Sequence, residues 1–228
     1  MSIVTKIKRI IALVSILILS VNTAYAKFYT VPADMAQYGQ QVYSTARGYH
    51  GRSFSGYCGT YVRCQLRAMG IFKDRFDVRG NGNQWYSNFE AIDKTSGGYS
   101  VYRESGADCI DKLQMKYGND LKNIVLSFPI QAGYSASSPG AGHALVIYEL
   151  RDNIAYYTES FSFSNYSEGE VIAEDIDSLL ERYSRRHGEV IGCVMLSSEQ
   201  NLVGSTMAEK IIISSIAGLE TMPMISII

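Results

Sequence analysis

The sequence predicts an α+β domain in which N-terminal helices pack on an antiparallel sheet. Two observations support this fold class. Apolar residues after Cys58 recur at helical spacing, and two β-favouring segments, residues 143–150 and 154–162, flank a polar turn as in an antiparallel hairpin. The helical patterns come first along the chain and the strand patterns later, an order that is typical of α+β domains.

Residues 1–26 have the pattern of a cleaved secretion signal. Three basic residues precede an apolar core over residues 10–19, and Ala24-Tyr25-Ala26 is a small-x-small cleavage site. The alternative is a membrane anchor, but the apolar run is shorter than the roughly 20 residues that a span needs. We therefore expect an exported protein, periplasmic or secreted, whose mature chain begins at Lys27 and has no integral membrane segment.

The mature chain is weakly acidic. The signal holds three of the 21 Lys and Arg residues and none of the 22 Asp and Glu residues, so the mature net charge is −4. This balance argues against nucleic acid as a partner, because nucleic acid binding requires a basic face. The length suits one domain over residues 27–196, followed by a C-terminal extension over residues 197–228 whose structure the sequence does not predict.

A first helix is predicted before the cysteine. Residues 31–47 have an apolar side that includes Met35, and Pro32 occupies the first turn, where its missing N–H is tolerated. A Gly-, Ser- and Arg-rich approach over residues 48–57 follows.

Cys58 opens the helix around which the other predicted elements are organised. Its apolar positions recur at spacings of one, four and three residues, and Gly70 lies where a glycine commonly ends a helix. These positions are Tyr61, Val62, Leu66 and Met69. A cysteine at a helix N-terminus lies at the positive end of the helix dipole, which favours thiolate over thiol. Cys58 is therefore the candidate nucleophile.

The remaining chain alternates between loops and short regular segments. A loop rich in Gly and Asn follows Gly70 and ends at Trp85, and Asp74 and Asp77 within it lack the spacing of a calcium-binding loop. Helices are predicted over residues 107–117 and 176–186, and further strands over residues 124–128 and 190–196.

Four cysteines leave two interpretations open. In an exported protein two disulfides are the default, with three connectivities. If Cys58 is a free nucleophile, at most one bridge forms, and Cys109 with Cys193 is the pairing that we expect. Cys64, on a different face of the same helix as Cys58, is then a buried thiol.

A cysteine nucleophile needs a base within hydrogen-bond reach and a third group that orients the base. The chain has three histidines. His143 begins a strand directly after a glycine-rich segment, whereas His187 lies at a helix end that should face water and His50 lies in the approach segment. We therefore assign the base to His143.

Glu159 is the candidate orienting residue. It lies near the middle of the strand expected beside the one that bears His143, and a carboxylate there is costly unless it is hydrogen-bonded. We expect it to accept the His143 Nδ1–H, which would turn Nε2 toward the sulfur of Cys58. The alternative is a Glu159 side chain that points to solvent from an edge strand.

Several segments together resemble the CHAP family, papain-like cysteine amidases and endopeptidases related to the NlpC-type cell-wall hydrolases. They are YCGTYVRCQLRAMGI, GNGNQWY, GHALVIYEL and a strand with TES, and the resemblance covers residues 53–162. By the family's pattern Cys58 is the nucleophile, His143 the base and Glu159 the orienting residue. The resemblance also implies a papain-like fold and places Trp85 at an aromatic position near the site.

The expected function is cleavage of amide bonds in peptidoglycan by an exported cysteine amidase or endopeptidase, without a cofactor or a metal. The backbone N–H of Cys58 would be one oxyanion donor, with a second from residues 52–57. Tyr57 and Trp85 either line a substrate groove or belong to the core. A toxic wall hydrolase would also need an inhibitor or immunity protein as a partner.

Two alternatives remain at this point. One is a papain-like protease or acyltransferase that acts on a substrate outside the wall. The other is a non-catalytic module in which all four cysteines pair and His143 is structural.

Overall fold

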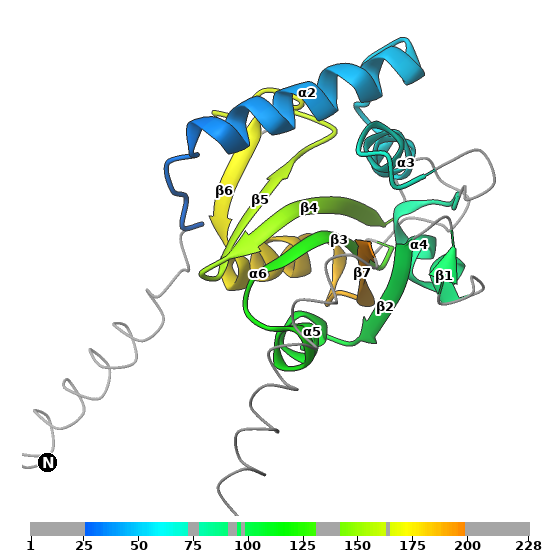
Figure 1. The fold of residues 1–228 in the computed structure, drawn as a ribbon, viewed down its shortest axis with the longest axis vertical. Helices are drawn as coiled ribbons and strands as arrows, with labels where there is room; N and C mark the ends of the chain where they lie inside the picture. Colours follow the sequence, from blue (N-terminus) through cyan, green and yellow to red (C-terminus); the bar gives the residue numbers. More distant parts are fainter. Residues whose placement is uncertain are drawn as a thin grey trace, which may run out of the picture.

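The computed structural model describes residues 26–72, 78–90, 95–96, 99–130, 142–162 and 165–198. In this part of the chain an antiparallel sheet lies between two layers of helices (Figure 1). Some predicted segments lie outside the described residues. They are residues 1–25 of the predicted secretion signal, residues 199–228 of the C-terminal extension, and Asp74 and Asp77.

Five α-helices and one 3-10 helix occur in the described residues. They are α2 (Ala33–His50), α3 (Cys58–Ala68), η1 (Gly82–Gln84), α4 (Trp85–Glu90), α5 (Cys109–Tyr117) and α6 (Ile176–His187). The strands are β1 (Thr95–Ser96), β2 (Tyr99–Ser105), β3 (Leu121–Phe128), β4 (His143–Arg151), β5 (Ile154–Thr158), β6 (Val171–Asp175) and β7 (Gly192–Ser198). Their order in the sheet is β1-β2-β7-β3-β4-β5-β6.

The predicted α+β class and the packing of N-terminal helices on an antiparallel sheet are confirmed. Helix α3 begins at Cys58, and Gly70 follows its end with a φ of 74°, a conformation that glycine adopts without strain. Strands β4 and β5 form the predicted hairpin, with Asp152 and Asn153 both at positive φ in the turn. Pro32 is the residue before α2 rather than part of its first turn.

Three predictions about elements need correction. The loop predicted up to Trp85 ends in η1, and α4 begins at Trp85, while β1, β2 and β6 were not predicted. Strand β5 ends at Thr158, so Glu159 lies just beyond the strand rather than near its middle.

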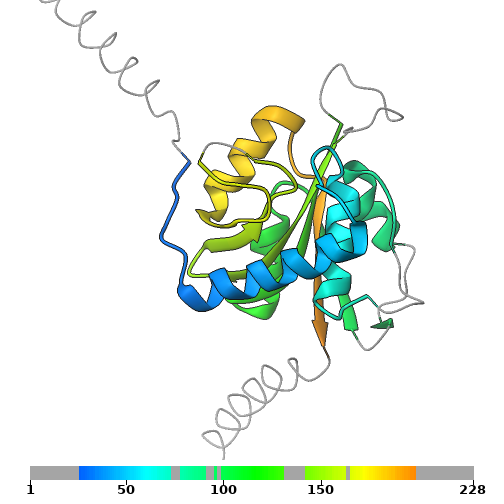
Figure 2. The same ribbon diagram turned by 90° about the horizontal axis from the view of Figure 1, so that it is seen from above.

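The two faces of the sheet carry separate apolar cores. Alternating residues of β3 point to opposite faces, so Val125 belongs to the core that includes residues of α2, α3 and α4, while Leu126 belongs to the core that includes residues of α5 and α6. The view from above in Figure 2 shows α2 and α6 on opposite sides of the strands. Every residue of β4 except Arg151 is buried, because helices cover both faces of this central strand.

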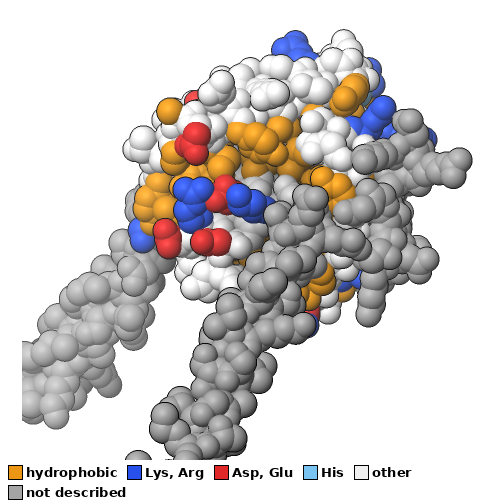
Figure 3. Space-filling model, viewed as in Figure 1, with side chains coloured by type: hydrophobic (Ala, Val, Ile, Leu, Met, Phe, Trp, Pro, Cys, Tyr) orange, Lys and Arg blue, Asp and Glu red, His pale blue; other side chains and the backbone are white. Residues whose placement is uncertain are grey.

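Polar and apolar groups are mixed on the surface seen in Figure 3. A band of hydrophobic side chains crosses this face, and acidic and basic side chains stand next to one another beside it. This face therefore presents no large field of a single sign. Among the described residues no helix is both long and apolar enough to cross a membrane.

Candidate active site

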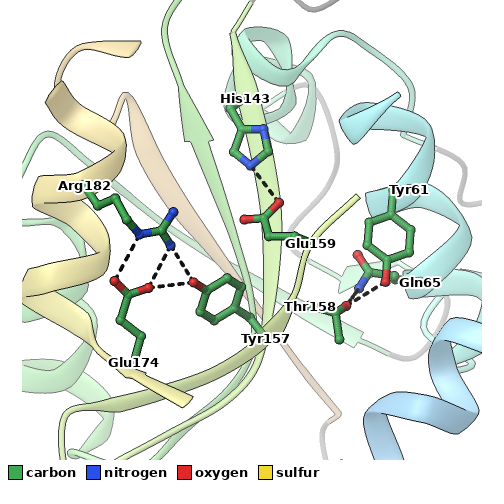
Figure 4. A network of polar contacts seen from close by, with 8 residues as sticks. All are labelled: Tyr61, Gln65, His143, Tyr157, Thr158, Glu159, Glu174 and Arg182. Atoms are coloured by element: carbon green, nitrogen blue, oxygen red, sulfur yellow. Dashed lines mark hydrogen bonds and ion pairs between the residues drawn. The ribbon is translucent and has the colours of Figure 1, made fainter. Parts of the chain in front are cut away.

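The three residues predicted for the site come from three elements whose ends converge. Cys58 is the first residue of α3, His143 is the first residue of β4, and Glu159 directly follows β5. Because β4 and β5 are antiparallel, the start of β4 lies beside the end of β5. The His143 Nε2 atom lies 3.4 Å from Glu159 Oε2 (Figure 4).

Glu159 is a buried carboxylate that faces the imidazole. Only 1% of its surface is exposed, and its Oε1 atom has no hydrogen-bond partner among the described residues. This burial excludes the alternative in which the side chain points to solvent. A buried carboxylate with few hydrogen bonds is costly to ionise alone, so a positive charge on His143 stabilises it.

The ring orientation of His143 is the reverse of the prediction. Nε2, not Nδ1, faces Glu159. The thiol of Cys58 hydrogen-bonds the same imidazole, which leaves Nδ1 for the sulfur. The order of the three groups is as predicted, but the two nitrogens have exchanged roles.

Electrostatics in this cluster favours an ion pair of thiolate and imidazolium. Burial raises the pKa of the Cys58 thiol, but the hydrogen bond and charge of His143 outweigh it, so the pKa lies below the usual value. Burial lowers the pKa of His143, but the Glu159 charge and the Cys58 hydrogen bond outweigh it and raise the pKa to about 10. Both shifts stabilise the charged forms, as a cysteine nucleophile requires.

A pocket of about 220 Å³ gives access to the sulfur. Cys58 is half-buried, whereas His143 and Glu159 are almost completely enclosed. The pocket is lined by Ser55, Gly56, Cys58, Gly142, His143, Ser160, Phe161, Arg186 and His187. A substrate that enters it therefore meets the thiol directly and the carboxylate only through His143.

Helix α6 contributes two rings to the site that the sequence did not predict. Tyr183 stacks on His143 with ring centroids 4.7 Å apart and an interplanar angle of 9°. The ring of His187 also stacks on His143, with a centroid distance of 5.5 Å. His187 thus lines the pocket instead of facing water. The spacing in the sequence could have indicated this, because Tyr183 and His187 are four residues apart and residues at this spacing share one face of a helix.

The Gly- and Asn-rich loop holds the starts of α3 and β4 together. A Cβ atom on Gly59 would lie 2.3 Å from the Gly80 carbonyl oxygen, and one on Gly82 would lie 2.5 Å from the backbone of His143. The Ser127 hydroxyl donates to the Gly82 carbonyl at 2.5 Å. The loop therefore fits closely between Gly59, the residue after Cys58, and His143.

The two predicted substrate-binding aromatics lie outside the pocket. Trp85 is completely buried and packs near Phe72 and Phe89, so it is a core residue and the predicted substrate contact is wrong for it. Tyr57 precedes α3 and is 43% exposed, but its ring stacks with the Arg52 guanidinium and does not line the pocket.

A buried polar network fixes α3 to the strands beside Glu159. Thr158 Oγ1 lies 2.7 Å from the hydroxyls of Tyr61 and Tyr148, and it accepts a hydrogen bond from Gln65 Nε2 at 2.8 Å. Figure 4 shows Tyr61 and Gln65 on the helix directed at Thr158. The residue before Glu159 is thus tied to the helix that begins at Cys58.

A second network lies on the opposite face of β5. Glu174, fully buried, accepts from the Tyr157 hydroxyl at 2.6 Å and from Arg182 at 2.7 and 3.1 Å (Figure 4). This pairing neutralises the buried carboxylate of Glu174 within the α6 layer. Thr158 and Tyr157 therefore fix the end of β5 from both sides.

The approach segment before Cys58 is also held in place. Glu168 accepts hydrogen bonds from the Phe54 N–H at 2.9 Å, the Tyr43 hydroxyl at 3.2 Å and the Ser53 hydroxyl. The Tyr57 N–H donates to the Phe54 carbonyl at 2.7 Å. These bonds form a tight turn immediately before Cys58.

Two backbone N–H groups at the pocket have no partner among the described residues. The Cys58 N–H lies at the first position of α3, where helical hydrogen bonds are absent. Gly56 lines the pocket with a φ of 80°, and no hydrogen bond from its N–H to a described residue exists. This identifies Gly56 as a candidate donor within the predicted range of residues 52–57.

All four cysteines are free thiols in this structure. The expected bridge between Cys109 and Cys193 is not formed, although the two thiols hydrogen-bond each other in the core. Burial raises the pKa of Cys193 far above its usual range, and Cys64 is also buried. Cys58 alone among the four is partly exposed.

The described residues contain no cluster of three or more His, Cys, Asp or Glu that is suited to hold a metal ion.

The chain matches no protein-family model and shows no significant similarity to a curated protein.

Proposed function

We propose that this protein is an exported cysteine amidase or endopeptidase with a papain-like arrangement of Cys58, His143 and Glu159, and that it cleaves amide bonds in peptidoglycan. One observation carries the catalytic part. A half-buried thiol at a helix start hydrogen-bonds an enclosed histidine, which faces a buried carboxylate 3.4 Å away. The resemblance of the segments around these residues to the CHAP family supports the wall substrate.

The first half of the reaction forms a thioester. The Cys58 thiolate attacks the amide carbonyl carbon, and the electron pair of the C=O bond moves to oxygen, where the Cys58 and Gly56 N–H groups stabilise it. When this intermediate collapses, the C–N bond breaks, and the leaving amine takes a proton from His143 Nδ1. Glu159 stabilises the imidazolium before transfer and keeps Nδ1 directed at the sulfur.

The second half releases the acid. Neutral His143 takes a proton from water, and the oxygen attacks the thioester carbonyl. The C–S bond breaks, and the Cys58 thiolate and the His143 imidazolium are restored. Each turnover consumes one water and yields one amine and one carboxylic acid.

The test is digestion of purified sacculi by the mature protein, with the released fragments identified by mass. We expect a new amine and a new carboxyl terminus, and loss of both products in Cys58→Ala and His143→Ala. Cys64→Ala is the matched control, because it removes a thiol from the same helix outside the pocket, and it should retain activity.

Two results would contradict the proposal. Full activity in Cys58→Ala would exclude the nucleophile. Cleavage of a protein substrate with no products from sacculi would replace the wall hydrolase with a papain-like protease.

A further inference from the structure

The C-terminal end of α6 places a cation in the wall of the pocket. Arg186 and His187 line it together with Cys58, and no carboxylate is among the lining residues. Glu159, the nearest acidic group of the proposed triad, is enclosed behind His143. Among the groups that line the pocket the thiolate and the imidazolium compensate each other, so the remaining charge on its wall is the positive charge of Arg186, while the charge of Glu159 lies behind His143.

The three arginines of α6 differ in what they bind. Arg182 pairs with the buried Glu174, and Arg185 pairs with Glu181 one turn earlier on the helix. Arg186 is exposed and forms no ion pair with a described residue. Its guanidinium is thus available to an anion that enters the pocket.

His187 adds a neutral donor beside this cation. Its Nδ1 atom is buried and has no hydrogen-bond partner among the described residues. Burial and the nearby charges of His143 and Arg186 lower its pKa to about 4, so the ring is neutral near pH 7. A neutral imidazole carries one N–H donor, so His187 adds a hydrogen-bond donor without a charge to the wall of the pocket.

We propose that Arg186 and His187 form a subsite for a carboxylate that the substrate carries next to the amide attacked by Cys58. The subsite rests on the proposed function and specifies its substrate class, an acidic peptide. A carboxylate fits because it is the anionic group that peptides carry, and guanidinium binds it with two parallel hydrogen bonds. The attraction is local, since the mature chain as a whole is acidic.

Alkylation of Cys58 tests the subsite without any turnover. Iodoacetate carries a carboxylate directly beside the carbon that the sulfur attacks, and iodoacetamide is its neutral counterpart. The ratio of their rates reports the charge in the pocket, because any change in the thiolate fraction affects both rates equally. Labelling is followed on the Cys58 peptide by mass, with Cys58→Ala as the blank.

Arg186→Gln should lower the iodoacetate-to-iodoacetamide ratio about two- to fivefold, the size typical of an exposed charge pair. Arg185→Gln is the matched control, because it removes the same charge from the neighbouring position outside the pocket, and its ratio should stay at the wild-type value. His187→Phe keeps an aromatic ring but removes the donor, and it should lower the ratio as well.

An unchanged ratio in Arg186→Gln, or an equal fall in Arg185→Gln, overturns the subsite. Digestion of sacculi by the same proteins separates this result from the proposed function. A lowered ratio without digestion by the wild type keeps the subsite and removes the wall substrate. Digestion with an unchanged ratio keeps the function and removes the subsite.

Discussion

Glu159 and His143 share an enclosed site in which each charge stabilises the other. Glu159 is 1% exposed and His143 is 4% exposed, so water screens their interaction weakly. The positive charge of His143 in turn lowers the pKa of Cys58. The pKa of the half-buried Cys58 thiol therefore depends, through His143, on a carboxylate that is itself enclosed.

Glu159→Gln tests this dependence, because it removes the charge and keeps the shape. The pKa of His143, followed by NMR of the imidazole, should fall from about 10 toward its usual value. Turnover should fall roughly 100-fold, at the lower end of what acid–base catalysis contributes, with little change in KM. Cys58→Ala, by contrast, should abolish turnover.

Glu149→Gln is the control for this variant. Glu149 lies at the other end of β4 and pairs with Arg151. Neither the pKa of His143 nor turnover should change. A His143 pKa that stays near 10 in Glu159→Gln would show that the carboxylate does not set it.

The choice of Cys58, His143 and Glu159 followed from residue types and their order, but finer features did not. Which ring nitrogen faces Glu159 depends on the side-chain torsions of His143 in the folded core. The pocket position of His187 depends on how α6 packs against β4, a contact between distant segments. Local patterns contain neither kind of information.

At the scale of elements, the loop from Gly80 to Asn83 sets the spacing of the site. It touches α3 at Gly59 and β4 at His143, and in both places a side chain on the glycine would meet backbone atoms. Backbone atoms cannot turn away as a flexible side chain can. The close packing at these glycines thus helps to hold Cys58 near His143.

Two glycines in helices allow a matched comparison. In Gly59→Ala the new methyl group would lie 2.3 Å from the Gly80 carbonyl oxygen, so we expect a loss of stability of about 1–3 kcal/mol, typical of overpacking, and reduced activity. Gly48 in α2 has open space around it, so Gly48→Ala should stabilise by about 0.5–1 kcal/mol through helix propensity.

Urea unfolding of the two variants measures both effects, and digestion of sacculi measures activity. Gly48→Ala should keep wild-type activity. Equal stabilisation of the two variants would mean that the loop does not pack against α3 as described.

Some elements were predictable because their pattern is local and strong. Helix α3 has an apolar stripe and a terminal glycine, and the β4–β5 hairpin has β-favouring residues on both sides of a polar turn. Helix α4 spans six residues, too few for a helical period to be evident. Strand β2 is rich in polar residues, and it joins the sheet by pairing with β7, which is distant in the sequence.

At the scale of the molecule, the site lies where the two helical layers meet at one end of the sheet. Cys58 comes from the α3 layer, His143 and Glu159 come from the sheet and its edge, and the rings that stack on His143 come from the α6 layer. The buried networks at Tyr157 and Thr158 connect the sheet to both layers. The geometry of the site thus depends on the sheet and on both helical layers.

The most direct test of this account is the pH dependence of Cys58 alkylation by iodoacetamide in the native protein, compared with that in His143→Ala. A lowered thiol pKa means that thiolate persists as the pH falls, so wild-type Cys58 should still react quickly below pH 8.5, the usual thiol value. His143→Ala should react only as the pH rises toward that value. The account is contradicted if Cys58 titrates as an ordinary thiol in both proteins.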